Sequence, residues 1–167
     1  VPTPESDLRE LLSLSKPNGT FLELGSGDGR NLCMAIRSGF TLSVGVELSP
    51  LLVQFSRLRA WWCGVGQSIT VHWADALTAP LPVGVSAVYL YLSQDALVSL
   101  APRLACAYGG QRVAILSRDF ELPGCSEPRV RRQRGRTVLL YYEVSQMHLP
   151  PASECLRLSS GSINSAS

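Results

Sequence analysis

Apolar residues along the chain follow two kinds of spacing, and segments of the two kinds alternate along the sequence. Short apolar runs typical of buried strands occupy 20–24, 42–47, 68–73, 87–92, 112–116 and 137–144, with room for a weaker strand before the last of these. Segments with apolar residues three or four apart, typical of helices, occupy 5–14, 31–38, 50–62 and 94–107. Regular alternation of strand and helix predicts an α/β fold with a doubly wound, mostly parallel sheet.

Length and composition fit one compact domain. The chain has 167 residues, of which 46% are hydrophobic and 17% charged, so it can bury a core. We expect this domain to span 1–149 and the serine-rich remainder, 150–167, to be disordered because it has no apolar period. The formal net charge of +2 is too small to indicate a nucleic-acid partner by itself.

A glycine-rich turn follows the first predicted strand, in the sequence Glu23-Leu-Gly25-Ser-Gly27-Asp-Gly29. Glycine at alternate positions lets the backbone turn tightly and lets a ligand approach where a Cβ would collide. The spacing differs from the Gly-x-Gly-x-x-Gly that binds a dinucleotide pyrophosphate. Glu23 would also repel a phosphate but attract the amino group of an amino-acid ligand. A nicotinamide-dependent dehydrogenase is therefore the disfavoured alternative.

Two further acidic residues follow later strands in the expected order. Glu47 ends the second predicted strand, about twenty residues after the glycines, where a carboxylate can bind both hydroxyls of a ribose. Asp75 and Ala76 follow the third predicted strand, where a carboxylate can reach an adenine amino group. The three acidic positions predict a nucleoside ligand that carries an amino-acid group.

This ordered set resembles the class I S-adenosylmethionine-dependent methyltransferases. Within that class, the opening Val-Pro-Thr-Pro, Gly45–Pro50, Tyr89–Leu92 and Ser117–Phe120 resemble the motifs of a group of small protein-lysine methyltransferases. The group includes the mitochondrial enzymes that modify the adenine nucleotide carrier and the c subunit of ATP synthase. The resemblance implies a Rossmann-like fold with a mostly parallel seven-stranded sheet, helices on both faces and a C-terminal antiparallel strand.

The resemblance also assigns roles to individual residues. It implies S-adenosylmethionine as cofactor, no metal, and these cofactor contacts: Thr3, Glu23, Gly25, Ser26, Gly27, Asp28, Gly29, Glu47, Leu48, Asp75, Ala76 and Leu90. It places Tyr91, Ser93, Asp119 and Phe120 along the acceptor channel, with no obligatory catalytic side chain. Two structural alternatives stay open, a core aromatic for Tyr91 and a loop cap for Asp119.

The substrate implied by the resemblance is the ε-amino group of a protein lysine. The loop at 122–128 lacks the tryptophan that members of the group carry there, and this loop should border the substrate. An RNA methyltransferase and a non-catalytic scaffold subunit are the alternatives. The resemblance implies an intracellular and specifically mitochondrial protein, although this chain shows no N-terminal signal.

Five arginines cluster before the last predicted strand, at Arg129, Arg131, Arg132, Arg134 and Arg136. On a hairpin they would project to both faces. They predict either an anionic partner such as RNA, an acidic protein or a membrane surface, or a solvated hairpin that keeps a sheet edge from aggregating.

Two of the cysteines and two adjacent tryptophans are expected to have structural roles. The chain has five cysteines and no Cys-x-x-Cys pair, which argues against a zinc site or a disulfide framework and favours a reducing compartment. Cys33 and Cys63 are expected to be small core residues on helices. Trp61 and Trp62 lie on a predicted helix and are interpreted as packing residues.

Overall fold

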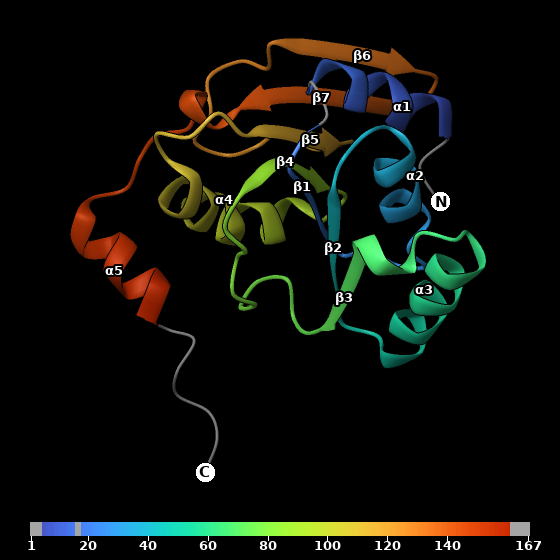
Figure 1. Cartoon of the computed structure of the whole chain (residues 1–167). Coiled ribbons are helices and arrows are strands. Elements are labelled where there is room, and N and C mark those ends of the chain that lie inside the picture. The colour runs from blue at the N-terminus through green and yellow to red at the C-terminus, as the bar shows by residue number, and fades with distance from the viewer. Residues whose placement is uncertain (1–4, 16–17, 161–167) are drawn as a thin grey trace.

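A seven-stranded sheet with the strand order β3-β2-β1-β4-β5-β7-β6 forms the centre of the molecule (Figure 1). The computed structural model describes residues 5–15 and 18–160. The strands are β1 (Thr20–Leu24), β2 (Leu42–Glu47), β3 (Ile69–Trp73), β4 (Val85–Leu90), β5 (Ala114–Arg118), β6 (Val130–Arg134) and β7 (Thr137–Glu143). The helices are α1 (Glu5–Leu14), α2 (Arg30–Arg37), α3 (Pro50–Trp62), α4 (Gln94–Tyr108) and α5 (Ala152–Ser160).

Strands β1 to β5 pair in parallel, as the alternation of strands and helices predicts. β7 pairs antiparallel with β5, and β6 pairs antiparallel with β7 at the edge of the sheet. The weaker strand expected before the last one is therefore β6, and the antiparallel part is a hairpin. Because β1 lies between β2 and β4, the chain changes direction across the sheet beside β1, and ligands of open α/β sheets bind at such a switch point.

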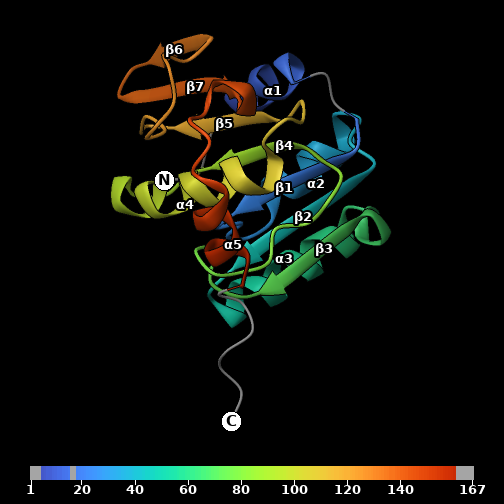
Figure 2. The same ribbon diagram turned by 90° about the vertical axis from the view of Figure 1, so that its left-hand side faces the viewer.

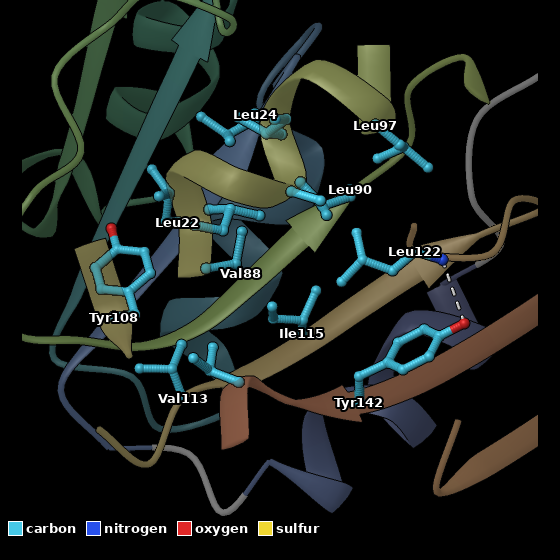
Figure 3. Packing of buried hydrophobic residues seen from close by; sticks show 14 of the residues in the cluster. Leu22, Leu24, Val88, Leu90, Leu97, Tyr108, Val113, Ile115, Leu122 and Tyr142 are labelled. Atoms are coloured by element: carbon cyan, nitrogen blue, oxygen red, sulfur yellow. Dashed lines mark hydrogen bonds between the residues drawn. The ribbon is translucent and has the colours of Figure 1, made fainter. Parts of the chain in front are cut away.

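Helices cover both faces of the sheet, as expected (Figures 1 and 2). On one face, α1 to α3 bury Leu8, Leu32 and Val53 together with Tyr89 of β4. On the other face, α4 buries leucines against β1, β4 and β5, and Figure 3 shows this cluster with Leu22, Val88, Leu97 and Ile115. The short helix α5 lies beside α4.

The C-terminal segment contains a helix where the sequence analysis expects disorder. Helix α5 occupies Ala152–Ser160, and a disulfide joins its Cys155 to Cys106 on α4. The expectation of disorder is wrong over this helix, because the segment gains order from a covalent bond and from packing on α4 rather than from an apolar period. The expectation of no disulfide is also wrong for this pair; residues 161–167 lie outside the described residues.

The three remaining cysteines are free, and Cys33 is buried in the core as expected, whereas Cys63 is half-buried at the end of α3. The interpretation of Trp61 and Trp62 as packing residues is wrong, since their exposed fractions are 71% and 81%. α3 turns only one side toward the sheet, where it buries Val53, Ser56 and Ala60. The two tryptophans leave the helix on other sides.

Candidate functional site

The glycine-rich turn crosses the carboxyl ends of β1 and β2. Gly25, Gly27 and Gly29 all have positive φ angles, of 82°, 56° and 74°. The backbone N–H groups of Gly25 and Ser26 both donate to the carbonyl oxygen of Val46, at 2.8 and 3.0 Å. The turn is therefore fastened across the end of β2, and α2 begins directly after it.

Two of these glycines differ in what surrounds them. A Cβ on Gly29 would lie 1.9 Å from the Ser56 Oγ atom of α3, so this position is closed by close packing. A Cβ on Gly27 would meet no atom within 4 Å. The open side of the turn at Gly27 is where a ligand can approach the backbone.

Glu23 lies beneath the turn with an exposed fraction of only 3%. Its Oε1 atom accepts a hydrogen bond of 2.6 Å from the Asn31 side-chain amide. Removal from water raises the pKa of the Glu23 carboxyl to about 8, against the opposing effect of the Asn31 hydrogen bond. Nearby Asp28 and Glu47 raise this pKa further. Asn31 was not predicted as a site residue, although it opens the helix after the glycines.

Three buried polar atoms at this turn lack a hydrogen-bond partner among the described residues: Glu23 Oε2, Ser26 Oγ and Asn31 Oδ1. Buried polar groups are nearly always paired, because an unpaired one costs about 1–3 kcal/mol. Asn31 Oδ1 can only accept, Glu23 Oε2 accepts once the carboxyl is ionised, and Ser26 Oγ belongs to a hydroxyl. The set suits a ligand with a cationic amino group, which donates several hydrogen bonds.

Glu47 links the turn to the start of α3. Its Oε2 atom accepts from the Gly27 N–H at 2.8 Å, and its Oε1 atom accepts from the Ser49 N–H at 2.9 Å. Each carboxylate oxygen can still accept a further hydrogen bond. The carboxylate therefore lies beside the open side of Gly27, and its predicted contact with ribose hydroxyls is compatible with this position.

The Asp28 carboxylate, a predicted cofactor contact, is already occupied by two arginines. Its carboxylate forms ion pairs with Arg30 at 2.7 Å and Arg59 at 2.9 Å. The hydrogen bonds from Arg30 lower the pKa of the Asp28 carboxyl below its ordinary value, with a smaller electrostatic effect of Arg59. The Arg59 guanidinium also donates to the Asp28 carbonyl oxygen. The Asp28 side chain therefore ties the turn to α3.

The loop after β3 is held by the side chain of Arg103, for which the sequence pattern predicts no role. Asp75 is exposed, and its Oδ1 atom accepts from the Leu77 N–H at 2.8 Å. The Arg103 guanidinium of α4 donates to the carbonyl oxygens of Ala76, Leu77 and Ala79. Arg103 thus fixes the backbone that carries the predicted adenine-binding residues.

Leu48 and Leu90, two other predicted cofactor contacts, lie in different surroundings. Leu48 is exposed just before α3, and its carbonyl oxygen accepts from the Trp73 Nε1–H at 2.9 Å. Leu90 ends β4 with its side chain fully buried in the core on the α4 side. Only the backbone of Leu90 is therefore available at the site, and Thr3 lies outside the described residues.

Tyr91 follows the end of β4 and is not a core aromatic. Its exposed fraction is 40%, and the Arg118 guanidinium carbon lies 4.5 Å from the centre of its ring. Arg118, which ends β5, is itself buried and was not predicted. The half-exposed Phe120 follows two residues later. The carboxyl ends of β4 and β5 are adjacent, so an aromatic ring and a guanidinium lie at the predicted acceptor side.

Ser93 and Asp119 have structural roles here. The Ser93 hydroxyl accepts from the Ala96 N–H and so caps α4. Asp119 has a positive φ of 67°, its Oδ1 atom accepts from the Val138 N–H at 2.9 Å, and its N–H donates to the Val138 carbonyl. The loop-cap alternative for Asp119 therefore describes its contacts, whereas its contact with an acceptor stays a prediction.

The arginine cluster lies on the β6–β7 hairpin at the outer edge of the sheet. Three of its members face glutamates: Arg129 pairs with Glu143, Arg131 with Glu121 and Arg132 with Glu10. All three pairs are largely exposed to solvent. These carboxylates compensate much of the positive charge, which favours the solvated-hairpin alternative over a dedicated anion-binding surface.

Neutralising Arg131, Arg132 and Arg134 together to glutamine should change the melting temperature little, because exposed ion pairs contribute only about 0–1 kcal/mol each. Cofactor affinity should also stay unchanged, since the hairpin is remote from the glycine turn. Thermal unfolding and calorimetry measure the two quantities. A large loss of stability would reveal a structural role, and weaker binding to an anionic polymer at low salt would favour the anionic-partner alternative.

Within residues 5–15 and 18–160, no helix is both long enough and apolar enough to cross a membrane. The same residues contain no cluster of three or more His, Cys, Asp or Glu side chains suited to a metal ion.

The chain matches a known protein family over the segment that carries the glycine turn and the acidic residues described above. The family model described as the ANTKMT methyltransferase domain matches residues 23–129, from the carboxylate under the glycine turn to the start of the hairpin. The chain belongs to this methyltransferase-domain family.

Several relatives of this family member carry lysine methyltransferase names. The chain is 38% identical over 76 residues to the human ATP synthase c-subunit lysine N-methyltransferase, covering 45% of this chain and 32% of that protein. It is 42% identical over 57 residues to mouse adenine nucleotide translocase lysine N-methyltransferase, covering 34% and 25%. The chain therefore matches about a third or less of the length of these relatives.

Solved structures confirm the class I methyltransferase fold. An RNA methyltransferase from Salinibacter ruber in complex with S-adenosyl-L-homocysteine superposes with a TM-score of 0.79 at 26% identity, covering 91% of this chain and 97% of that one. An S-adenosylmethionine-dependent methyltransferase from Geobacter sulfurreducens has a TM-score of 0.58 at 24% identity, over 70% of this chain and 48% of that one. At that identity the second likeness concerns the fold alone.

Proposed function

We propose that this family member is an S-adenosylmethionine-dependent methyltransferase whose acceptor is a protein lysine. The observation that carries the proposal is the buried Glu23 carboxylate with an unpartnered oxygen beneath the glycine turn, among the residues that the family model matches. The names of the relatives support lysine as the acceptor. A mitochondrial location stays a prediction from the same resemblance.

The residues of the turn fit the cofactor in order. Glu23 would bind the methionine amino group, the backbone at Gly27 would pass beneath the ligand, and Glu47 would bind the ribose. Asp75, on the loop fixed by Arg103, would reach the adenine. Bound S-adenosylmethionine supplies an activated methyl group on a sulfonium. The protein mainly aligns the two reactants, and alignment alone can lower a barrier by about 7–11 kcal/mol.

A lysine acceptor must lose a proton before its nitrogen can form a bond to the methyl carbon. The reference pKa of lysine is about 10.4, so the ammonium form must be disfavoured. The Arg118 guanidinium lies over Tyr91 and is paired with the Asp119 carboxylate at 3.4 Å, so this pair supplies little net charge at the acceptor side. The rings of Tyr91 and Phe120 offer an apolar wall instead, and removal from water lowers the pKa of an amine.

The test of this function uses radiolabelled S-adenosylmethionine and a cell lysate, with a Glu23→Gln variant, in which cofactor binding should be weaker, as the control. We expect label that protease digestion releases and that amino-acid analysis recovers as methyl-lysine. Label that survives protease but is lost to ribonuclease would identify RNA, the alternative favoured by the Salinibacter ruber neighbour. Cofactor binding without any labelled product would identify a scaffold.

Replacing Glu47 by alanine should weaken cofactor binding by about 1–3 kcal/mol, the cost of leaving a buried hydrogen-bonding group without its partner. The carboxylate would no longer bind ribose hydroxyls or hold the Gly27 N–H. Calorimetric titration with S-adenosylhomocysteine measures the change, with the exposed Glu121→Ala as the matched control. An affinity equal to that of the wild type would remove Glu47 from the site.

A further inference from the structure

Helix α3 carries large apolar side chains on the face that points away from the sheet. Leu51, Phe55, Leu58 and Trp62 follow each other at spacings of four, three and four residues, so they form one line along the helix. Each of them is more than half exposed, and we call this line the apolar ridge. Trp61 adds a second exposed ring in edge contact with Trp62.

The opposite side of the same helix already covers the protein core. Val53, Ser56 and Ala60 are buried against β2 and β3 and the neighbouring helix. The ridge is therefore not the packing face of α3, and burying it contributes nothing to the described fold. Contiguous exposed apolar surface rimmed by polar residues marks an interaction site on a folded protein.

The charged residues of α3 itself have one sign. Helix α3 contains Arg57 and Arg59 and no acidic residue. These arginines flank Leu58 in the sequence and so leave the helix about 100° to either side of the ridge. Arg59 pairs with Asp28, whereas the Arg57 guanidinium donates only to the carbonyl oxygen of Val71 among the bonds described. A basic rim beside an apolar line fits a partner that is apolar in its interior and anionic at its surface.

A second copy of the chain fits this surface less well than a lipid surface does. Pairing two ridges would bring the arginines of one copy toward those of the other, and like charges repel. A membrane leaflet with anionic lipids offers phosphates to the arginines and an acyl region to the leucines. Tryptophan is also enriched at membrane–water interfaces, and Trp61 and Trp62 stand at one end of the ridge.

We propose that α3 docks on an anionic lipid surface, with the apolar ridge at the boundary between headgroups and acyl chains. A helix in this position lies in the plane of the membrane, about 5–10 Å into it, and Arg57, which has no acidic partner among the bonds described, can reach the phosphates. The hairpin arginines take no part, because β6 lies at the opposite edge of the sheet from β3, on which α3 packs. The inference does not depend on the proposed methyl transfer.

The test is co-sedimentation with vesicles of phosphatidylcholine mixed with phosphatidylglycerol, and with vesicles of phosphatidylcholine alone. We expect the wild type to bind the mixed vesicles at low salt, and to bind them more weakly at 0.15 M salt, where screening acts over about 8 Å. A Phe55→Ser/Trp62→Ser variant should partition at least about tenfold more weakly, because it removes two large apolar side chains.

The matched control replaces two apolar residues that are also exposed but lie elsewhere, in a Val83→Ser/Val98→Ser variant. It should bind vesicles like the wild type, and both variants should keep the melting temperature of the wild type. In a Trp73→Phe variant only Trp61 and Trp62 emit, and brominated lipids should quench that emission. This measurement tests the contact without altering the ridge.

Four outcomes would overturn the proposal. They are absence of vesicle binding by the wild type, equal binding to neutral and anionic vesicles, unchanged binding of the ridge variant, and tryptophan emission that brominated lipids do not quench. Self-association of the wild type that the ridge variant abolishes, without vesicle binding, would assign the ridge to a second copy. Methyl transfer can succeed or fail independently of each result, so the two hypotheses are tested separately.

Discussion

Replacing Glu23 by glutamine should weaken S-adenosylmethionine binding at least tenfold, because charge-assisted hydrogen bonds contribute about 1.5–3 kcal/mol. The substitution should also abolish the release of a proton that accompanies cofactor binding to the wild type. In the ligand-free protein the pKa of Glu23 is about 8, so the carboxyl is mostly protonated at pH 7. Binding a cationic amino group requires the carboxylate, and the proton must then leave. Affinity of the wild type should therefore rise with pH up to about 8.

Calorimetric titrations at pH 7 in two buffers of different ionisation enthalpy measure that proton. We expect release approaching one proton for the wild type and none for Glu23→Gln. A Glu121→Gln variant is the matched control, because Glu121 is an exposed acid and is not among the groups that raise the pKa of Glu23. If the wild type binds without releasing a proton, Glu23 does not contact the amino group.

Glu23→Gln, which should weaken cofactor binding, should by contrast stabilise the ligand-free protein. The pKa of Glu23 is about 8 in the folded protein, against an ordinary value of 4.5. The stability that the protonated Glu23 carboxyl contributes is therefore fully present below pH 4.5. It falls by about 1.4 kcal/mol per pH unit between pH 4.5 and about 8, and it is lost above that pH. Glutamine removes this slope. Urea unfolding at pH 5 and pH 8 should show the variant gaining relative to the wild type at the higher pH; parallel curves would contradict the buried carboxyl.

Replacing Gly29 by alanine should destabilise the protein by about 2–5 kcal/mol. Two costs add: a left-handed backbone conformation at a residue with a Cβ, and a clash in a packed interior. The clash is with Ser56, whose Oγ atom would lie 1.9 Å from the new Cβ. Urea unfolding measures the loss. Because α3 must move to relieve the clash, cofactor affinity should fall as well.

Gly27→Ala provides the comparison, since Gly27 also has a positive φ but no atom within 4 Å of the position that a Cβ would take. It should lose only the backbone part of the stability, about 1–2 kcal/mol. Cofactor affinity should fall all the same, because the new methyl group occupies the open side of the turn. Equal destabilisation by the two variants would mean that the contact with Ser56 is unimportant.

Much of this fold could be predicted from local pattern. The bounds of β1, β2, α1 and α3 follow from apolar spacing together with a glycine turn and a proline at a helix start, which act within a few residues. The three acidic positions were predictable for the same reason, since parallel strands bring their carboxyl ends to one edge. Glu23 and Glu47 lie on either side of the glycine turn as that geometry requires.

Contacts between distant segments could not be predicted in this way. Arg118 meets Tyr91 from a neighbouring strand, and Arg103 reaches a loop more than twenty residues earlier. Helix α5 is held by a disulfide across 49 residues, which no periodicity reveals. Trp61 and Trp62 were misinterpreted because apolar character was equated with burial. On a helix at the edge of a sheet, only the tertiary arrangement decides which apolar face is covered.

The contact between α1 and β7 has a consequence for synthesis on the ribosome. Helix α1 lies beside β7 (Figure 1). Its Leu8 and Leu12 are fully buried in a cluster that includes Leu139 of β7, and the half-buried Glu10 pairs with Arg132 of the hairpin. The helix is translated before the hairpin, and this part of its covering follows more than 120 residues later. At about 5–20 residues per second, its leucines wait several seconds for that partner. During this interval α1 is a natural binding segment for a chaperone.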